Sequence, residues 1–75
     1  MKVGDVVTIT AKYPYNTNVN CEGETGVITE HDVENNVFEI TTGNPYTTEY
    51  WYEETEFRLA TEEEIKDRLR YLLMD

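Results

Sequence analysis

The hydrophobic pattern of this chain changes its period once, and that change limits what the chain can fold into. Residues 6–12, VVTITAK, place Val7 and Ile9 on one side and Val6 and Thr8 on the other. Alternation of β-branched side chains predicts a strand. Pro14 and Gly23 lie in a long connecting loop. Further strands are expected at residues 26–32, 37–42 and 46–53, with a shorter one at 57–59.

After residue 59 the spacing becomes helical, and we expect a helix over residues 62–74. Thr61 followed three residues later by Glu64 matches a capping box. An apolar stripe at i, i+4, i+7 and i+8 then comprises Ile65, Leu69, Leu72 and Leu73. Four or five short strands and one helix in 75 residues predict a single domain, 1–75, that is mainly β. A small antiparallel barrel suits strands this short.

Three segments resemble the SH3-like small barrels, especially the KOW type: VGDVVTI (3–9), GETGVITEHD (23–32) and VFEI (37–40). In that family a Gly-Asp pair opens the first strand. The resemblance covers about residues 3–59 and implies an SH3-like barrel to which the helix is an addition. KOW-type barrels often bind RNA or the transcription machinery through basic residues near the loops. Acidic residues stand there in this chain, which argues against direct binding of nucleic acid.

The charge of the chain is −10, and its distribution is uneven. Between Lys12 and Arg58 there is no Lys or Arg, while residues 13–57 contain ten acids. The remaining six acids and six bases balance. Such a segment repels nucleic acid and anionic membranes and attracts a basic protein surface or a cation.

No group of residues predicts catalysis, a metal site or a cofactor. The chain has no serine, and nothing converges on its one histidine, His31, which is expected to be a solvated turn residue. Cys21 is expected to be buried or half-buried, and a single cysteine allows no internal disulfide. The acids of residues 30–36 lack the glycine of a calcium loop. Without a signal peptide or a membrane-spanning run, a cytoplasmic location is expected.

The segment EYWYEETE, residues 49–56, combines three consecutive aromatic residues with four glutamates. In a strand, Trp51 and Glu53 point to one side and Tyr50 and Tyr52 to the other. Either side can face the core, and the sequence leaves open which one does. Alternate carboxylates on a strand lie about 6.6 Å apart, a spacing of the same order as that of neighbouring phosphates in a nucleic-acid strand. Aromatic residues among them are the anchors that protein interfaces favour.

We therefore expect a non-enzymatic DNA mimic that occupies the DNA-binding surface of a basic protein. In size and charge the chain resembles small acidic host-takeover proteins of bacteriophages, and the nucleoid protein HU of the host cytoplasm is the best guess for the partner. The alternative is an SH3-like module that binds a transcription, replication or phage structural protein by shape. The residues expected at the partner-binding site are Glu22, Glu24, Glu30, Asp32, Glu34, Glu49, Trp51, Glu53, Glu54 and Glu56.

The helix also offers a surface for a homodimer. Its apolar side chains exceed what one side of a small barrel needs for its core. The residues expected at that interface are Leu69, Leu72 and Leu73.

Overall fold

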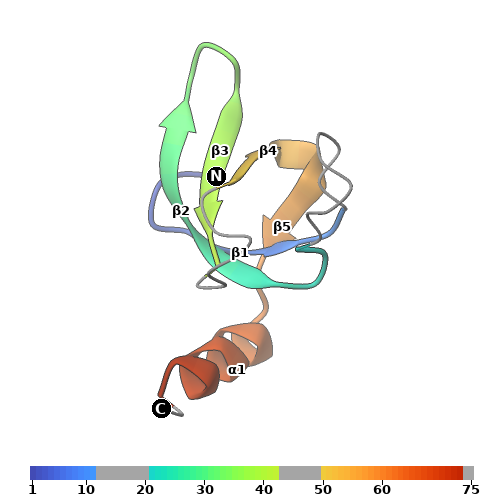
Figure 1. The fold of residues 1–75 in the computed structure, drawn as a ribbon, viewed down its shortest axis with the longest axis vertical. Helices are drawn as coiled ribbons and strands as arrows, with labels where there is room; N and C mark the ends of the chain where they lie inside the picture. The colour runs from blue at the N-terminus through green and yellow to red at the C-terminus, as the bar shows by residue number, and fades with distance from the viewer. Residues whose placement is uncertain (12–20, 43–49, 74–75) are drawn as a thin grey trace.

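A computed structural model describes residues 1–11, 21–42 and 50–73, and the side chains as far as residue 70. The fold is mainly β with one C-terminal helix, which confirms the expected fold class (Figure 1). Its elements are β1 (Val6–Ile9), β2 (Thr25–Asp32), β3 (Val37–Thr41), β4 (Tyr50–Glu53), a 3-10 turn η1 (Glu54–Glu56), β5 (Phe57–Leu59) and α1 (Glu62–Leu73).

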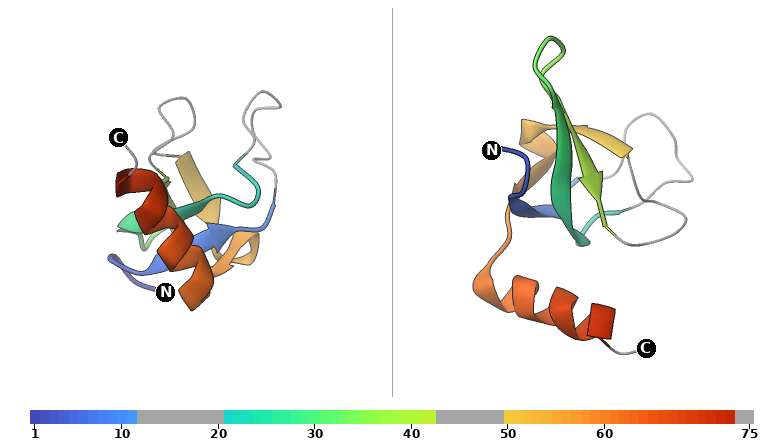
Figure 2. Two further views of the ribbon diagram at one scale, coloured as in Figure 1. Left: turned by 90° about the horizontal axis from the view of Figure 1, so that it is seen from below. Right: turned by 90° about the vertical axis from the view of Figure 1, so that its left-hand side faces the viewer.

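The five strands form one antiparallel sheet in the order β4-β3-β2-β1-β5. β2 is the longest strand, with eight residues, and it pairs with β1 near its start and with β3 near its end. The sheet bends around the core, and the β2–β3 hairpin projects from it at the end opposite α1 (Figures 1 and 2). Among the described residues β4 and β5 do not pair with each other, so the sheet is open rather than closed into a full barrel.

The core lies on the inner face of this bent sheet, as the alternation of apolar residues predicts. Gly26 lies where the backbones of β2 and β3 leave no room for a side chain, because a Cβ there would lie 2.6 Å from the Thr41 carbonyl oxygen. The buried apolar residues are Val7, Ile9, Cys21, Ile28, Phe38, Ile40, Tyr52 and Phe57.

A β-bulge in β2 changes which side chains face this core. Ile28 pairs with Ile40, but the next pair is Glu30 with Glu39, so Thr29 is an extra residue. Strict alternation would place Glu30 on the same face as Ile28, toward the core. The extra residue reverses the alternation, so that Glu30 faces outward and His31 faces inward beside Phe38. The bulge therefore keeps the acids of this strand in contact with water.

The start of α1 is fixed to the sheet by polar contacts. The expected capping box is confirmed: the Glu64 backbone N–H donates to Thr61 Oγ1 at 3.2 Å, and the Thr61 N–H donates to Glu64 Oε1 at 2.8 Å. Arg58 of β5 donates to both oxygens of the same carboxylate, at 2.7 and 2.9 Å. The Arg58 and Thr61 hydrogen bonds lower the pKa of Glu64 to about 2. One turn later, Arg68 Nε donates to the Thr25 carbonyl oxygen at 3.2 Å.

As a result α1 lies beneath the β1–β2 part of the sheet (Figure 2). Thr8, which points away from the core, is buried there and shares a hydrogen bond of 3.0 Å with Thr25. The expected element boundaries hold within a few residues. β1 ends at Ile9 rather than at residue 12, and the N–H of Thr10 instead donates to the Glu56 carbonyl oxygen at 2.9 Å. Residues 46–49 of the expected fourth strand lie outside the described residues.

Candidate functional site

The outward face of β2, β3 and β4 carries two rows of residues that are neighbours across the strands. We call this surface the acidic face. Directly paired residues share one face of a sheet and place their Cβ atoms about 4.5–5.5 Å apart. The pairings Glu30 with Glu39 and Glu39 with Trp51 give the first row. The pairings of Val37 with Asp32 and with Glu53 give the second row. The face thus holds four carboxylates around one indole ring and one valine.

Alternation along β3 and β4 sets this orientation. In β3, Phe38 and Ile40 are buried, so Val37 and Glu39 point outward. In β4, Tyr52 is buried, and Trp51 next to it therefore points outward. The structure accordingly places the aromatic pair of Tyr50 and Tyr52 on the core side, where Tyr50 packs against the buried cluster.

Trp51 and Glu53 are thus on the outward side of the segment EYWYEETE. Trp51 is half-buried and so keeps some contact with water, while Glu53 is exposed. Glu49, which was expected to share this side, lies outside the described residues.

No cation among the described residues balances the acidic face. Residues 13–57 contain no Lys or Arg, and none of its carboxylates is in an ion pair within the described part of the chain. Glu30 and Glu39 are like charges placed directly opposite each other, an arrangement that destabilises a sheet. Glu39 Oε1 accepts a hydrogen bond of 2.7 Å from Thr29 Oγ1, so the bulge residue also positions this carboxylate.

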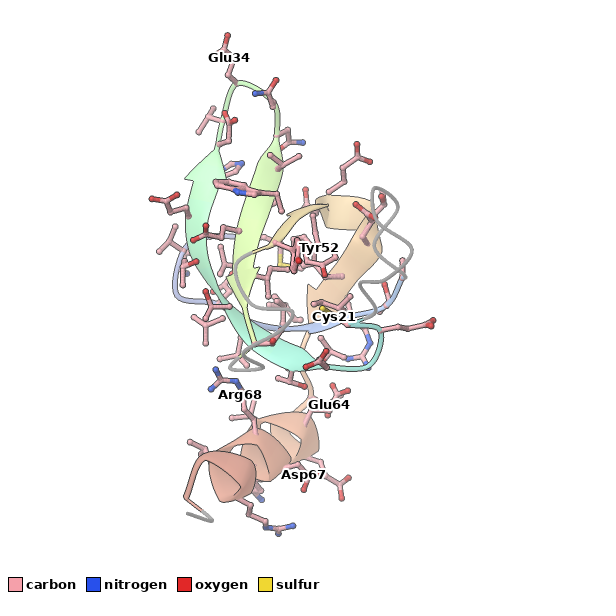
Figure 3. The ribbon with its side chains drawn as sticks, viewed as in Figure 1. Cys21, Glu34, Tyr52, Glu64, Asp67 and Arg68 are labelled. Atoms are coloured by element: carbon pink, nitrogen blue, oxygen red, sulfur yellow. The ribbon has the colours of Figure 1, made fainter. Side chains whose placement is uncertain are left out.

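The tip of the β2–β3 hairpin continues the negative charge beyond the face. Asp32 Oδ1 accepts hydrogen bonds from the N–H groups of Glu34 and Asn35, at 3.1 and 3.3 Å. Its Oδ2 accepts from Asn35 Nδ2 at 2.8 Å, and this side-chain bond is the main cause of the lowered pKa of Asp32. Asp32 therefore stays ionised to lower pH than usual. Glu34 stands exposed at the tip (Figure 3), next to Val33, which is 77% exposed.

His31 differs from the expected solvated turn residue. It is half-buried on the inner side of the hairpin, and its ring stacks on that of Phe38 with centroids 4.0 Å apart and planes at 3°. Its Nε2 lies 3.3 Å from Asn36 Oδ1. Phe38 in turn meets the edge of Phe57, with centroids 5.4 Å apart. The ring of His31 thus connects the hairpin to the core.

Two expected site residues lie in η1, directly after β4. Glu56 is half-buried, and its Oε1 accepts a hydrogen bond of 2.8 Å from the backbone N–H of Glu53. Glu54 is exposed and lies 4.0 Å from the N-terminal ammonium group of Met1. These residues adjoin the acidic face without being part of its two rows.

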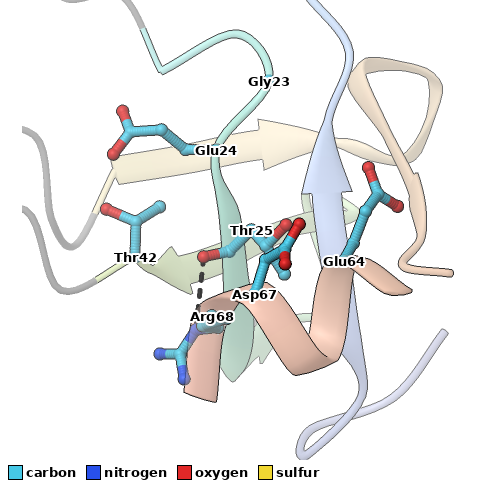
Figure 4. A pocket seen from close by; sticks show the side chains of 7 residues that line it. All are labelled: Gly23, Glu24, Thr25, Thr42, Glu64, Asp67 and Arg68. Atoms are coloured by element: carbon cyan, nitrogen blue, oxygen red, sulfur yellow. Dashed lines mark hydrogen bonds between the residues drawn. The ribbon is translucent and has the colours of Figure 1, made fainter. Parts of the chain in front are cut away.

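Glu22 and Glu24 lie outside the two rows of the acidic face, in the segment that leads into β2. Glu24 lines a groove of about 550 Å³ between α1 and the start of β2 (Figure 4). Its other lining residues are Gly23, Thr25, Thr42, Glu64, Asp67 and Arg68. The structure therefore does not bring Glu22 and Glu24 together with the expected site residues on β2 and β4.

Glu39 is the one carboxylate of the acidic face that was not expected at the site. The signal was present in the sequence, because VFEIT alternates and Glu39 lies between Phe38 and Ile40. Of the residues expected at a dimer interface, Leu69 is 52% exposed on α1, while the side chains of Leu72 and Leu73 lie outside the described part.

The described residues include no cluster of three or more His, Cys, Asp or Glu side chains placed to hold a metal ion. No helix in that part of the chain is long and apolar enough to span a membrane. Comparison with protein-family models, with curated proteins and with solved structures found no match to this chain.

Proposed function

We propose that this protein is a non-enzymatic DNA mimic, which binds a basic DNA-binding protein through the acidic face and blocks its access to DNA. The observation that carries the proposal is the continuous arrangement of Glu30, Glu39, Trp51 and Glu53 on neighbouring strands. No Lys or Arg belongs to these strands. A basic partner would supply the missing counter-charge.

The spacing of the face supports mimicry of a phosphate backbone. Outward residues of one strand are about 6.6 Å apart, and neighbouring strands are about 4.8 Å apart. Asp32 and Glu34 extend the charge along the hairpin. The result is a two-dimensional set of negative charges on a backbone held by sheet hydrogen bonds, whereas flexible acidic side chains on a loop would have no fixed spacing.

The stability that the sheet loses through opposed carboxylates also supports a role in binding. A like-charge pair such as Glu30 and Glu39 lowers the stability of the free sheet. Solubility does not require two carboxylates at directly opposed positions, because charges elsewhere on the surface serve equally well. A partner that presents cations to the pair would remove the repulsion on binding.

The test uses HU, the first candidate partner, and a short fluorescently labelled DNA duplex. Added protein should release the duplex from HU at low salt and lose this ability at high salt, because salt screens exposed charges. The variant E30Q/E39Q should compete at least about tenfold more weakly, since it removes both carboxylates of one row.

The matched control is E62Q/E63Q, which removes the same charge from exposed positions on α1. If both double variants lose affinity equally, net charge and not the acidic face determines binding. If HU is not bound at all, a nuclease-treated bacterial lysate is the next source of partners. Recovery of basic DNA-binding proteins that are released by salt and by competing DNA supports the mimic. Recovery of only neutral or acidic partners rejects it.

The second candidate function is an SH3-like interaction module that binds a transcription, replication or phage structural protein by shape. The exposed residue Val33 and the half-buried Trp51 favour it, because apolar and aromatic anchors act without charge. Binding that persists at high salt, is lost in a Trp51→Ala variant and is unchanged in E30Q/E39Q would identify this function instead.

A further inference from the structure

Trp51 has two glutamates as its neighbours on the acidic face. Glu39 lies directly opposite it on β3, and Glu53 follows two residues later on the same side of β4. Carboxylates at these two positions are within reach of a group that rests on the indole, because the spacings are about 5 Å across strands and about 6.6 Å along one. Trp51 therefore has one carboxylate residue as its neighbour across the strands and another along β4.

Glu39 is held in place before any partner arrives. Thr29 Oγ1 donates to its Oε1 at 2.7 Å and to its carbonyl oxygen at 3.3 Å. A carboxylate has about four acceptor positions, so this contact leaves the second oxygen able to accept from a ligand. Such a carboxylate loses less side-chain freedom on binding than one that is free to rotate.

We infer that Trp51 binds an arginine side chain of the basic partner, with Glu39 and Glu53 accepting hydrogen bonds from its N–H groups. We call this position the arginine seat. This inference rests on the proposed function, because it names the partner group that the acidic face selects. An indole attracts a cation over its face, and the attraction is strongest for tryptophan among the aromatic residues.

The geometry favours arginine over lysine. A guanidinium is planar, stacks on an aromatic ring and presents five N–H groups in its plane, so it can rest on Trp51 while donating sideways to carboxylates. A lysine ammonium is a compact and strongly hydrated charge that cannot do both with the same fit. Selection should therefore depend on the shape of the cation as well as on its charge.

The test uses two short peptides of equal length and charge, one of arginine residues and one of lysine residues. Trp51 is the only tryptophan in the chain, so intrinsic fluorescence reports on this position alone. The arginine peptide should bind about five times more tightly than the lysine peptide at the same ionic strength, and it should change the tryptophan emission more. Equal affinities and equal emission changes would overturn the inference.

Two variants distinguish the contribution of the indole ring to peptide binding from that of the carboxylates. These variants have no tryptophan, so their peptide binding is measured by isothermal titration calorimetry. Trp51→Leu should abolish the preference for arginine and keep the weaker, salt-dependent binding of both peptides, whereas Trp51→Phe should keep part of the preference. Circular dichroism establishes that each variant is folded, and the wild-type comparison of the two peptides remains decisive if Trp51→Leu is not. A preference that survives in folded Trp51→Leu overturns the inference.

The same experiment distinguishes the inference from the function on which it rests. Equal, salt-sensitive binding of both peptides leaves the acidic face as a binding site and rejects only the arginine seat. Failure of both peptides to bind at low salt rejects the seat and also counts against the proposed function.

Discussion

Glu30 and Glu39 are cross-strand partners on β2 and β3, so two carboxylates face each other with no cation on either strand. The pair exists because Thr29 is inserted as a bulge between Ile28 and Glu30. Without that insertion Glu30 would point to the core, where an unpaired charge is far more costly than on the surface. The bulge thus keeps the charge of Glu30 out of the core and places it opposite Glu39 on the outer face, where the two carboxylates repel each other.

Glu30→Gln should therefore increase stability while it weakens binding. We expect the free energy of unfolding to rise by about 0.2–1 kcal/mol at low salt, because the opposed charges no longer repel. Urea denaturation at low and high salt measures this, and the gain should shrink in high salt. A lower stability than that of the wild type would show that Glu30 has a stabilising partner in solution.

The contact between Arg58 and Glu64 should give the protein a specific acid response. Hydrogen bonds from Arg58 and from the Thr61 N–H lower the pKa of Glu64 from 4.5 to about 2. Because the folded-state pKa is the lower one, the stabilisation is complete above about pH 4.5 and disappears as the pH falls toward 2. Glu64→Gln should be less stable than the wild type near neutral pH, and the difference should shrink over that interval.

This prediction is tested by measuring the urea concentration at the midpoint of unfolding for the wild type and for Glu64→Gln across the acidic pH range. Glu62→Gln is the control, since Glu62 is exposed in the same turn of α1 and forms no ion pair with a described residue. A gap between wild type and Glu64→Gln that stays constant down to about pH 2 would contradict the role given to Arg58.

Gly26→Ala should destabilise the sheet by about 1–3 kcal/mol, the usual cost of overpacking. The new Cβ would lie 2.6 Å from the Thr41 carbonyl oxygen and 2.9 Å from Ile40 Cγ2, so β2 and β3 must separate. Thermal unfolding measures the change. An unaltered melting temperature would mean that the two strands are farther apart in solution than described here.

The stack of His31 on Phe38 should stabilise the hairpin. His31→Ala removes an aromatic pair of the kind that contributes about 0.5–1.5 kcal/mol beyond its buried area. His31→Phe keeps the ring and should recover most of this loss. Urea denaturation of the two variants near neutral pH gives the comparison, and equal losses in both would show that the histidine nitrogen atoms, rather than the stacked ring, stabilise the turn.

Local signals predicted much of this fold. Thr61 and Glu64 are three residues apart, and that spacing alone identified the start of α1. Phe38 and Ile40 alternate with Val37 and Glu39, and this pattern indicates which residues lie on each face of β3. In each case the interacting residues are close in sequence, and the pattern depends only on the geometry of one element.

The rest depends on contacts between distant segments. The choice between Trp51 and Tyr52 for the core is decided by what β4 meets across the sheet, since either face of YWYE is aromatic. The burial of Thr8 follows from the position of α1, and the bond from Arg58 to Glu64 joins β5 to that helix. The bulge at Thr29 has no local signature, although it determines the direction of every residue that follows it in β2.

That bulge divides β2 into two parts with separate roles. Before it, Gly26 and Ile28 are buried and are constrained by their neighbours. Beyond it, Glu30 and Asp32 face outward, and only His31 still touches the interior. Substitutions at the outward positions can therefore accumulate with little effect on folding. The surface proposed for binding could therefore be altered residue by residue while the same core is retained.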